Sequence, residues 1–227
     1  MIGLAIALFG PLVITAYKKS DKTDVGSLAS KFSLWFLVII IFLILFYGEK
    51  ETLHSIGFKK VTTRTFFIGF IGGIGSMAIM GFTFFIFKKI GLNNRENSFE
   101  KIIKLSLNKR VFIVLTAAFV EEILFRGYAI ERISLLTYNI WIAGIISTIF
   151  FTIAHISGWS IRHLIPVFIT GLFLSILYIL EKDIIACIIA HLIIDGVAFI
   201  LMPYLLNKKM QNKNITQNAE SKNPSSY

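Results

Sequence analysis

Long apolar segments are the feature of this sequence that most constrains its fold. A helix that crosses a bilayer needs roughly 17–25 mostly apolar residues. Seven stretches of about this kind occur, near 2–17, 32–47, 65–87, 111–130, 140–157, 164–180 and 184–206. The chain is 56% hydrophobic and only 16% charged, whereas soluble domains are about 25% charged. The sequence therefore predicts an all-α, polytopic transmembrane helix bundle with about seven spans. We allow six to eight, because the first two segments are short.

The domain organisation follows from the same pattern. No internal repeat and no separate soluble domain is visible in the sequence. Residues 1–206 are therefore predicted to form a single transmembrane helical domain, with a functional core over about 110–206. Residues 207–227 are rich in Asn, Ser and Lys, which is a composition typical of disordered segments.

The basic residues predict an orientation. Most of the 23 Lys and Arg residues fall in the segments 18–31 and 88–110 and in the C-terminal tail. Basic loops stay on the cytoplasmic side of a membrane. We therefore expect a multi-pass protein of the cell membrane with a cytoplasmic C-terminal tail. The net charge of +10 is explained by these segments, so the lipid bilayer and not nucleic acid is the expected partner.

Ionisable residues inside the apolar segments are the most informative feature for function. Four of the seven segments contain none. An ionisable side chain at the centre of a bilayer costs roughly 2.5–3.5 kcal/mol, so such residues are expected to meet one another. The other three segments hold Glu121, Glu122, Arg126, His155, His191 and Asp195. We therefore predict one buried polar site built by three helices.

The spacing of these residues suggests how they pair. Glu122 and Arg126 are four residues apart, so they share a helix face and can form an ion pair. Glu121 points in another direction and is left as the freer carboxylate. His191 and Asp195 are also four residues apart, so Asp195 could hold the imidazole in one tautomer.

The formal charge of the site leaves two possibilities open. With neutral histidines, two more carboxylates than cations are present. Either one carboxyl is protonated, which suits acid–base catalysis, or a divalent cation is bound. A zinc ion would have an acceptable ligand set in Glu121, His155, His191 and Asp195. The single cysteine, Cys187, excludes a zinc cluster made of cysteines and an intramolecular disulfide.

Three motifs at these positions resemble those of a known family. Residues 121–126 fit E-E-x-x-x-R, residues 151–155 fit F-x-x-x-H, and residues 191–195 fit H-x-x-x-N/D. In this order, on successive apolar helices, they resemble the CPBP intramembrane proteases, which include CAAX proteases and bacteriocin-processing or self-immunity (Abi) proteins. The resemblance covers about 110–200, and residues 1–109 add only hydrophobicity.

The resemblance implies a peptidase with its active site inside the membrane. The family's roles place Glu121 and His155 as the pair that activates water, and His191 and Asp195 at the oxyanion. Both a metalloprotease mechanism and a metal-free glutamate mechanism are proposed for the family. Asp195 departs from the asparagine variant of the motif, because an ionised carboxylate has no proton to donate. We expect Asp195 to orient His191, to be protonated or to bind a metal, and Glu122 with Arg126 to support the structure.

The substrate and two rival functions are left open by the sequence. The abundance of Ile, Lys, Phe and Asn is typical of low-GC bacteria, in which prenylated proteins are not expected. Maturation of a peptide pheromone or bacteriocin, or self-immunity to one, fits better. The first rival is a non-catalytic bacteriocin-immunity or regulatory scaffold. The second is an ion- or proton-coupled transporter that uses Glu and His as a relay.

Two further predictions concern residues outside the motifs. Gly69 and Gly73 form a G-x-x-x-G pair in an uncharged segment, which favours close helix packing. His54 and His163 are expected to be solvated, and Lys31 is grouped with the basic residues of a loop.

Overall fold

The chain is built from helices, as the sequence predicts. The computed structural model describes residues 1–19, 28–91 and 97–205, and the described residues contain no strand. The α-helices are α1 (Ile2–Lys19), α2 (Leu28–Leu43), α3 (Thr63–Lys89), α4 (Asn97–Ile103), α5 (Leu107–Thr116), α6 (Glu131–Thr137), α7 (Ile140–Ala154), α8 (Leu164–Glu181) and α9 (Ile184–Gly196). The π-helical segments η1 (Ile44–Gly48), η3 (Ala117–Ile130) and η4 (Val197–Leu201) extend α2, α5 and α9, and η2 (Leu53–Ile56) is a 3₁₀ turn.

Each predicted span coincides with a helix. Four helical stretches are long and apolar enough to cross a membrane, namely Lys31–Gly48, Thr63–Lys89, Leu164–Glu181 and Ile184–Leu205. Two apolar helices, Ile2–Ala16 and Ile140–Ala154, are shorter. The remaining predicted span, 111–130, contains three charged residues and lies within the continuous helix formed by α5, η3 and α6. The helical membrane bundle is confirmed, and the number of crossings stays a prediction. The sequence did not predict α4 and η2, and the polar tail lies outside the described residues.

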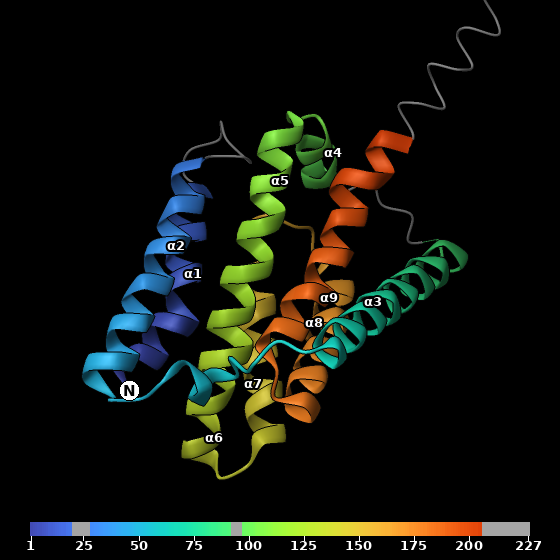
Figure 1. The fold of residues 1–227 in the computed structure, drawn as a ribbon. Coiled ribbons are helices and arrows are strands. Elements are labelled where there is room, and N and C mark those ends of the chain that lie inside the picture. The colour runs from blue at the N-terminus through green and yellow to red at the C-terminus, as the bar shows by residue number, and fades with distance from the viewer. Residues whose placement is uncertain (20–27, 92–96, 206–227) are drawn as a thin grey trace, which may run out of the picture.

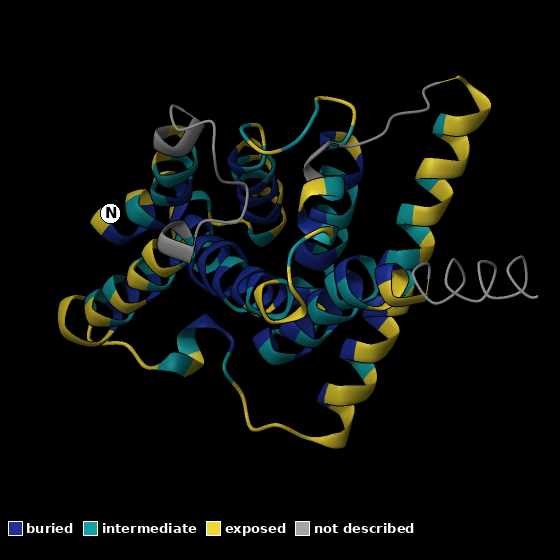
Figure 2. Cartoon of the chain, turned by 90° about the horizontal axis from the view of Figure 1, so that it is seen from above, coloured by how far each residue is buried: buried dark blue, intermediate teal, exposed yellow. Residues whose placement is uncertain are grey.

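The long helix formed by α5, η3 and α6 occupies the centre of the bundle (Figure 1). The paired helices α1 and α2 lie on one side of it, and α8 and α9 lie on the other. Nearly every residue of η3 is buried, and η3 contributes a large part of the main hydrophobic core. The buried centre and the more exposed outer helices are visible from above (Figure 2). The segment that carries the two glutamates is therefore the most enclosed part of the molecule.

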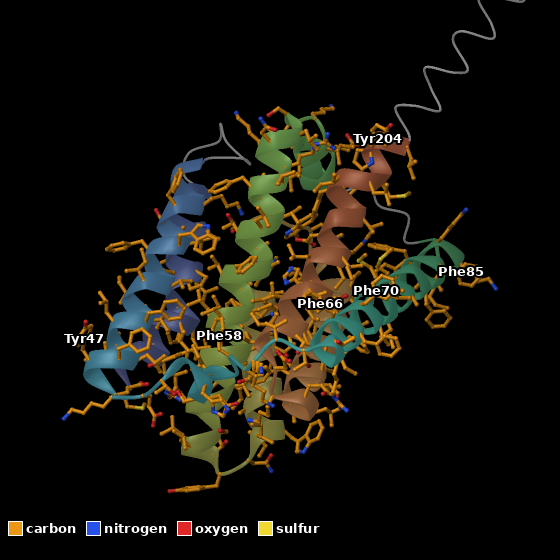
Figure 3. The ribbon with its side chains drawn as sticks, in the orientation of Figure 1. Tyr47, Phe58, Phe66, Phe70, Phe85 and Tyr204 are labelled. Atoms are coloured by element: carbon orange, nitrogen blue, oxygen red, sulfur yellow. The ribbon has the colours of Figure 1, made fainter. Side chains whose placement is uncertain are left out.

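Helix α3 leans away from the bundle and exposes aromatic side chains. Phe66, Phe70 and Phe85 lie on the surface of α3 (Figure 3). Its opposite face packs on α9 through small residues. A Cβ atom at Gly69 would lie 2.7 Å from Ile189 Cβ, and one at Gly73 would lie 2.8 Å from Ile193 Cβ. These distances confirm the prediction of close packing for the G-x-x-x-G pair.

Polar contacts fix the end of the bundle that carries α6. The Tyr128 hydroxyl donates to Glu49, and Arg132 pairs with the same carboxylate at 2.7 Å. Glu131 accepts hydrogen bonds from Tyr178 and Lys182. These bonds connect the ends of α2 and η1, α6, and the turn between α8 and α9. They hold the neighbouring helices against the central helix at this end of the bundle.

Candidate active site

Three helices bring the six predicted polar residues into one site. Glu121 Oε2 lies 3.9 Å from His155 Nε2 and 4.0 Å from His191 Nε2. Glu122 and Arg126 lie on the same segment as Glu121, and Asp195 lies one turn beyond His191. The residues come from η3, from the end of α7 and from α9. The carboxylate that the sequence left without a local partner thus faces two imidazole rings.

The two adjacent glutamates lie in a π-helical segment, η3, and have different surroundings. A π-helix has i→i+5 hydrogen bonds and a wider turn than an α-helix, and such segments often occur at functional sites. The side chain of Glu121 is 18% exposed, whereas that of Glu122 is fully buried at 0%. Glu121 is therefore available to a substrate or water, and Glu122 is not.

Glu122 joins two of the motifs. Its Oε1 accepts hydrogen bonds from Arg126 Nη1 at 2.9 Å and from His191 Nδ1 at 2.8 Å. The ion pair expected from the four-residue spacing is present. The sequence suggested Asp195 as the residue that orients His191, but the Nδ1 atom of this ring bonds to Glu122. Asp195 Oδ2 instead lies 3.5 Å from His191 Nε2.

Arg126 connects η3 to two further helices. Its Nη2 donates to the carbonyl oxygen of Gly171 at 3.1 Å, and its guanidinium lies 4.2 Å from the centre of the Phe151 ring. A Cβ atom at position 171 would lie 2.9 Å from Phe151 Cδ1, so only glycine lets these three groups meet. Arg126 therefore holds α7 and α8 against the segment that carries the glutamates.

His155 caps the C-terminal end of α7 and has a defined tautomer. Its Nδ1 lies 2.8 Å from the carbonyl oxygen of Phe151. A carbonyl oxygen only accepts hydrogen bonds, so Nδ1 carries the proton and donates. The Nε2 atom of the neutral ring then presents its lone pair toward Glu121. The F-x-x-x-H spacing is explained, since Phe151 supplies the acceptor for His155 and the ring that covers Arg126.

The site opens into a cavity of about 870 Å³. Glu121, His155, His191 and Asp195 all line it. Helices outside the motif region complete the wall, with Pro11 from α1, Leu34 from α2, Met80 and Phe84 from α3, and Phe99 from α4. Most of these wall residues are apolar. The volume of the cavity lies within the range of ligand-binding pockets, about 300–1,000 Å³.

One residue of the cavity wall corrects a prediction made from the sequence. Lys31, which the sequence grouped with a loop, lies in the first half of α2 and lines the cavity. His163 also lines the cavity, is partly exposed, and stacks its ring on Trp159 with centroids 4.3 Å apart. The wall further contains Thr170, whose buried hydroxyl has no hydrogen-bond partner among the described residues. The sequence offered one indication for Lys31, which lies directly beside a long uncharged segment. It offered no indication for Thr170.

The fit of a metal ion was tested on the donor atoms themselves. In the described part of the chain, no group of three or more His, Cys, Asp or Glu side chains is placed to hold a metal ion. The suggested zinc ligands Glu121, His155, His191 and Asp195 nevertheless face one another, with Glu121 3.9–4.0 Å from the histidines. The chemistry below is derived from the chain's own residues.

A comparison with known protein families identifies the family to which the motif region is related. Residues 105–197 match the family model described as type II CAAX prenyl endopeptidase Rce1-like. These residues form an Rce1-like domain. It runs from just before α5 to the first residue of η4 and contains all six polar residues of the site. The resemblance inferred from the three motifs over about 110–200 is thereby confirmed. Searches of curated proteins and of solved structures found no match for the chain.

The Rce1-like domain supplies the polar cluster but not the whole cavity. Helices α1 to α4 precede residue 105 and provide part of the wall, including Lys31. The family relationship and the apolar helices together support an endopeptidase in a membrane. The cavity therefore combines residues of the Rce1-like domain with residues outside it.

Proposed function

We propose that this chain is an intramembrane endopeptidase that hydrolyses a peptide bond with a water molecule activated by Glu121 and His155. The observation that carries the proposal is the pair of atoms Glu121 Oε2 and His155 Nε2, 3.9 Å apart on the wall of the cavity. Both atoms accept hydrogen bonds when Glu121 is ionised and His155 is protonated on Nδ1. Their separation lets one water molecule donate a hydrogen bond to each of them.

The proposed reaction begins when this water attacks the peptide carbonyl carbon. Glu121 takes one proton of the water as the new carbon–oxygen bond forms, and the carbonyl oxygen becomes an oxyanion. Glu121 then gives the proton to the amide nitrogen, and the carbon–nitrogen bond breaks. The products are a carboxylic acid and an amine, and Glu121 returns to its ionised form. Such general acid–base steps typically accelerate a reaction by about 10²–10⁴-fold.

His191 is proposed to stabilise the oxyanion. Its Nδ1–H donates to Glu122, so a ring protonated on both nitrogens has its Nε2–H left for the oxyanion. Asp195, 3.5 Å from Nε2, stabilises that cationic ring by its charge. Donors aimed in advance at the developing charge are usually a large part of catalysis in a dry site. Glu122 and Arg126 support the site by fixing the His191 ring and the three helices.

The proposed substrate is a membrane-associated peptide or protein. The matching family description names a prenyl endopeptidase. The composition of this chain is instead typical of low-GC bacteria, in which prenylated proteins are not expected, so a bacterial peptide is the favoured substrate. We propose maturation of a peptide pheromone or bacteriocin, or self-immunity to one, as the biological role. The scaffold alternative does not require Glu121 to face two histidines on a cavity wall. A transporter with a Glu–His relay would also bring these residues together, but the internal repeat on which many transporters are built is not visible in the sequence.

The proposal is tested by comparing peptides released from cells. Cells lacking the protein are supplied with the wild type, with Glu121→Gln, or with Glu51→Gln at matched expression, and membrane and secreted peptides are identified by mass spectrometry. Glu51 is exposed and remote from the motifs, so its variant controls for the same change of charge. We expect defined peptides with the wild type and Glu51→Gln that are missing with Glu121→Gln. Identical peptide profiles, together with a deletion phenotype that Glu121→Gln rescues, would favour the scaffold alternative.

A further inference from the structure

Lys31 is a cation on the cavity wall that the proposed reaction does not use. It belongs to α2, outside the Rce1-like domain, and its side chain is half-buried against the cavity. The ion pairs of the described residues do not include Lys31. A cation in a largely apolar cavity is costly unless it gains an anionic partner.

The register of α2 against the central helix fixes the height of Lys31 relative to Glu121. The rings of Phe32 and Phe112 lie 5.4 Å apart, and Trp35 Nε1 donates to Thr116 Oγ1 at 3.1 Å. From the first contact to the second, the residue numbers increase on both helices. The two helices therefore run parallel, as Figure 1 also shows. Lys31 is therefore level with about residue 111, which is about ten residues before Glu121. At 1.5 Å per residue this offset is about 15 Å along the helix axis.

The carboxylates on the cavity wall influence where a negatively charged substrate group can bind. Glu100, Glu121 and Asp195 line the same cavity, and the ion pairs of the described residues join none of them to Lys31. A substrate carboxylate placed at Lys31 would be held apart from Glu121 and Asp195. An extended peptide advances about 3.3–3.6 Å per residue, so an offset of about 15 Å corresponds to about four residues. The reach of the Lys31 and Glu121 side chains shortens this distance.

We propose that Lys31 binds a carboxylate of the peptide substrate, about four residues or fewer from the bond that is cut. This inference rests on the proposed peptidase function. The carboxylate is either the C-terminus of the peptide or an Asp or Glu side chain, and both present the same chemistry to an ammonium group. Lys31 would then determine which bond of the substrate reaches Glu121.

Binding to an inactive protein tests the site without cleavage. Full-length Glu121→Gln protein in lipid nanodiscs is titrated with three fluorescent apolar decapeptides, and anisotropy gives each dissociation constant. The first peptide has a free C-terminal carboxylate, the second is the same peptide with a C-terminal amide, and the third is amidated and carries one Asp. We expect at least one carboxylate peptide to bind about tenfold or more tightly than the neutral amide. The free-acid arm and the Asp arm identify the source of the carboxylate.

Variants of Lys31 decide whether this residue is responsible. Lys31→Met should remove the preference for a carboxylate, and Lys31→Arg should keep it. Lys109→Met removes the same charge from an exposed position in α5 and should leave the preference intact. Equal binding of the three peptides to protein that retains Lys31 would overturn the inference. So would an unchanged preference in Lys31→Met.

Cleavage by the wild type separates this inference from the proposed function. Where the wild type cuts the carboxylate peptides, mass spectrometry should place the cut within about four residues of the carboxylate. Cuts scattered along the peptides would contradict the proposed distance of about four residues between the carboxylate and the bond that is cut. A carboxylate preference that depends on Lys31, in a protein that cuts no peptide, would leave the binding site standing and count against the peptidase.

Discussion

At the scale of single residues, the two adjacent glutamates differ in role because they differ in surroundings. Glu121 is partly exposed to the cavity and faces His155 and His191. Glu122 is buried, and one of its oxygens serves both Arg126 and His191. The first is placed for chemistry on a substrate, and the second is placed to hold the groups that surround it.

His155 should matter far more for catalysis than for folding. His155→Ala is expected to lower kcat by about 10²–10⁴-fold, because it removes one of the two atoms that hold the attacking water. The free energy of unfolding should fall by only about 1 kcal/mol, the usual contribution of one hydrogen bond such as that from Nδ1 to the Phe151 carbonyl oxygen. His54→Ala is the matched control, because His54 is exposed in η2. Full activity of His155→Ala on a peptide that the wild type cuts would contradict the proposed role.

Arg126 and Glu122 should depend on each other for stability. Arg126→Met leaves the buried Glu122 carboxylate without its guanidinium partner, so the free energy of unfolding should fall by roughly 3–5 kcal/mol. The double variant Glu122→Gln with Arg126→Met should cost clearly less than the sum of the single variants. Denaturant unfolding in mixed micelles, followed by circular dichroism, gives the three values. Additive losses would show that the pair is not coupled.

The site residues were largely predictable from the sequence, and their contacts were not. Ionisable residues are rare inside apolar segments, so Glu121, His155 and Asp195 were conspicuous. Spacing also predicted the pair of Glu122 with Arg126. The bond from His191 to Glu122 joins residues 69 positions apart, and no local pattern reports such a contact. Lys31 was missed because a lysine next to an apolar run is normally an interfacial residue.

At the scale of helices, close packing of α3 on α9 depends on glycines in α3. Helix α3 also contacts α8, and its outer surface carries exposed aromatic residues (Figures 1 and 3). The G-x-x-x-G spacing predicted the packing, but the sequence did not identify α9 as the partner. The π-helical form of η3 was also unpredictable, because its residues fit an α-helical pattern equally well.

A larger residue at Gly69 should loosen α3 from α9. Gly69→Val places a Cβ atom 2.7 Å from Ile189 Cβ and 2.8 Å from the Ala186 carbonyl oxygen, and overpacking of this kind typically costs about 1–3 kcal/mol. Gly81→Val is the matched control, since no atom lies within 4 Å of a Cβ at that position. The same unfolding assay compares the two variants. Equal stability of both would show that the α3–α9 contact does not contribute.

At the scale of the whole molecule, both halves of the chain form the cavity. The Rce1-like domain supplies the polar cluster, and helices that precede residue 105 supply Lys31 and part of the apolar wall. This shared cavity supports the proposal that residues 1–206 act as one domain. Hydrophobicity predicted the helices, whereas the shape of the cavity depends on side-chain contacts between distant helices.

The orientation in the membrane gives a prediction for the whole molecule. A single cysteine is introduced at Lys104 or at Tyr138, which is highly exposed beyond α6, in a Cys187→Ala background. The two positions lie toward opposite ends of the bundle (Figure 1). The distribution of basic residues predicts that a membrane-impermeant maleimide labels position 138 in intact cells and position 104 only after lysis. The reverse labelling would contradict the predicted orientation.

The most direct test of the account is peptide hydrolysis by purified protein with and without the Glu121 carboxylate. Wild type, Glu121→Gln and Glu51→Gln are compared in lipid nanodiscs on the peptides identified in cells, and circular dichroism checks that their folds match. We predict that the wild type and Glu51→Gln cut at one defined bond, and that the rate with Glu121→Gln is lower by about 10²-fold or more. Hydrolysis of the same bond by Glu121→Gln at the wild-type rate would contradict the account.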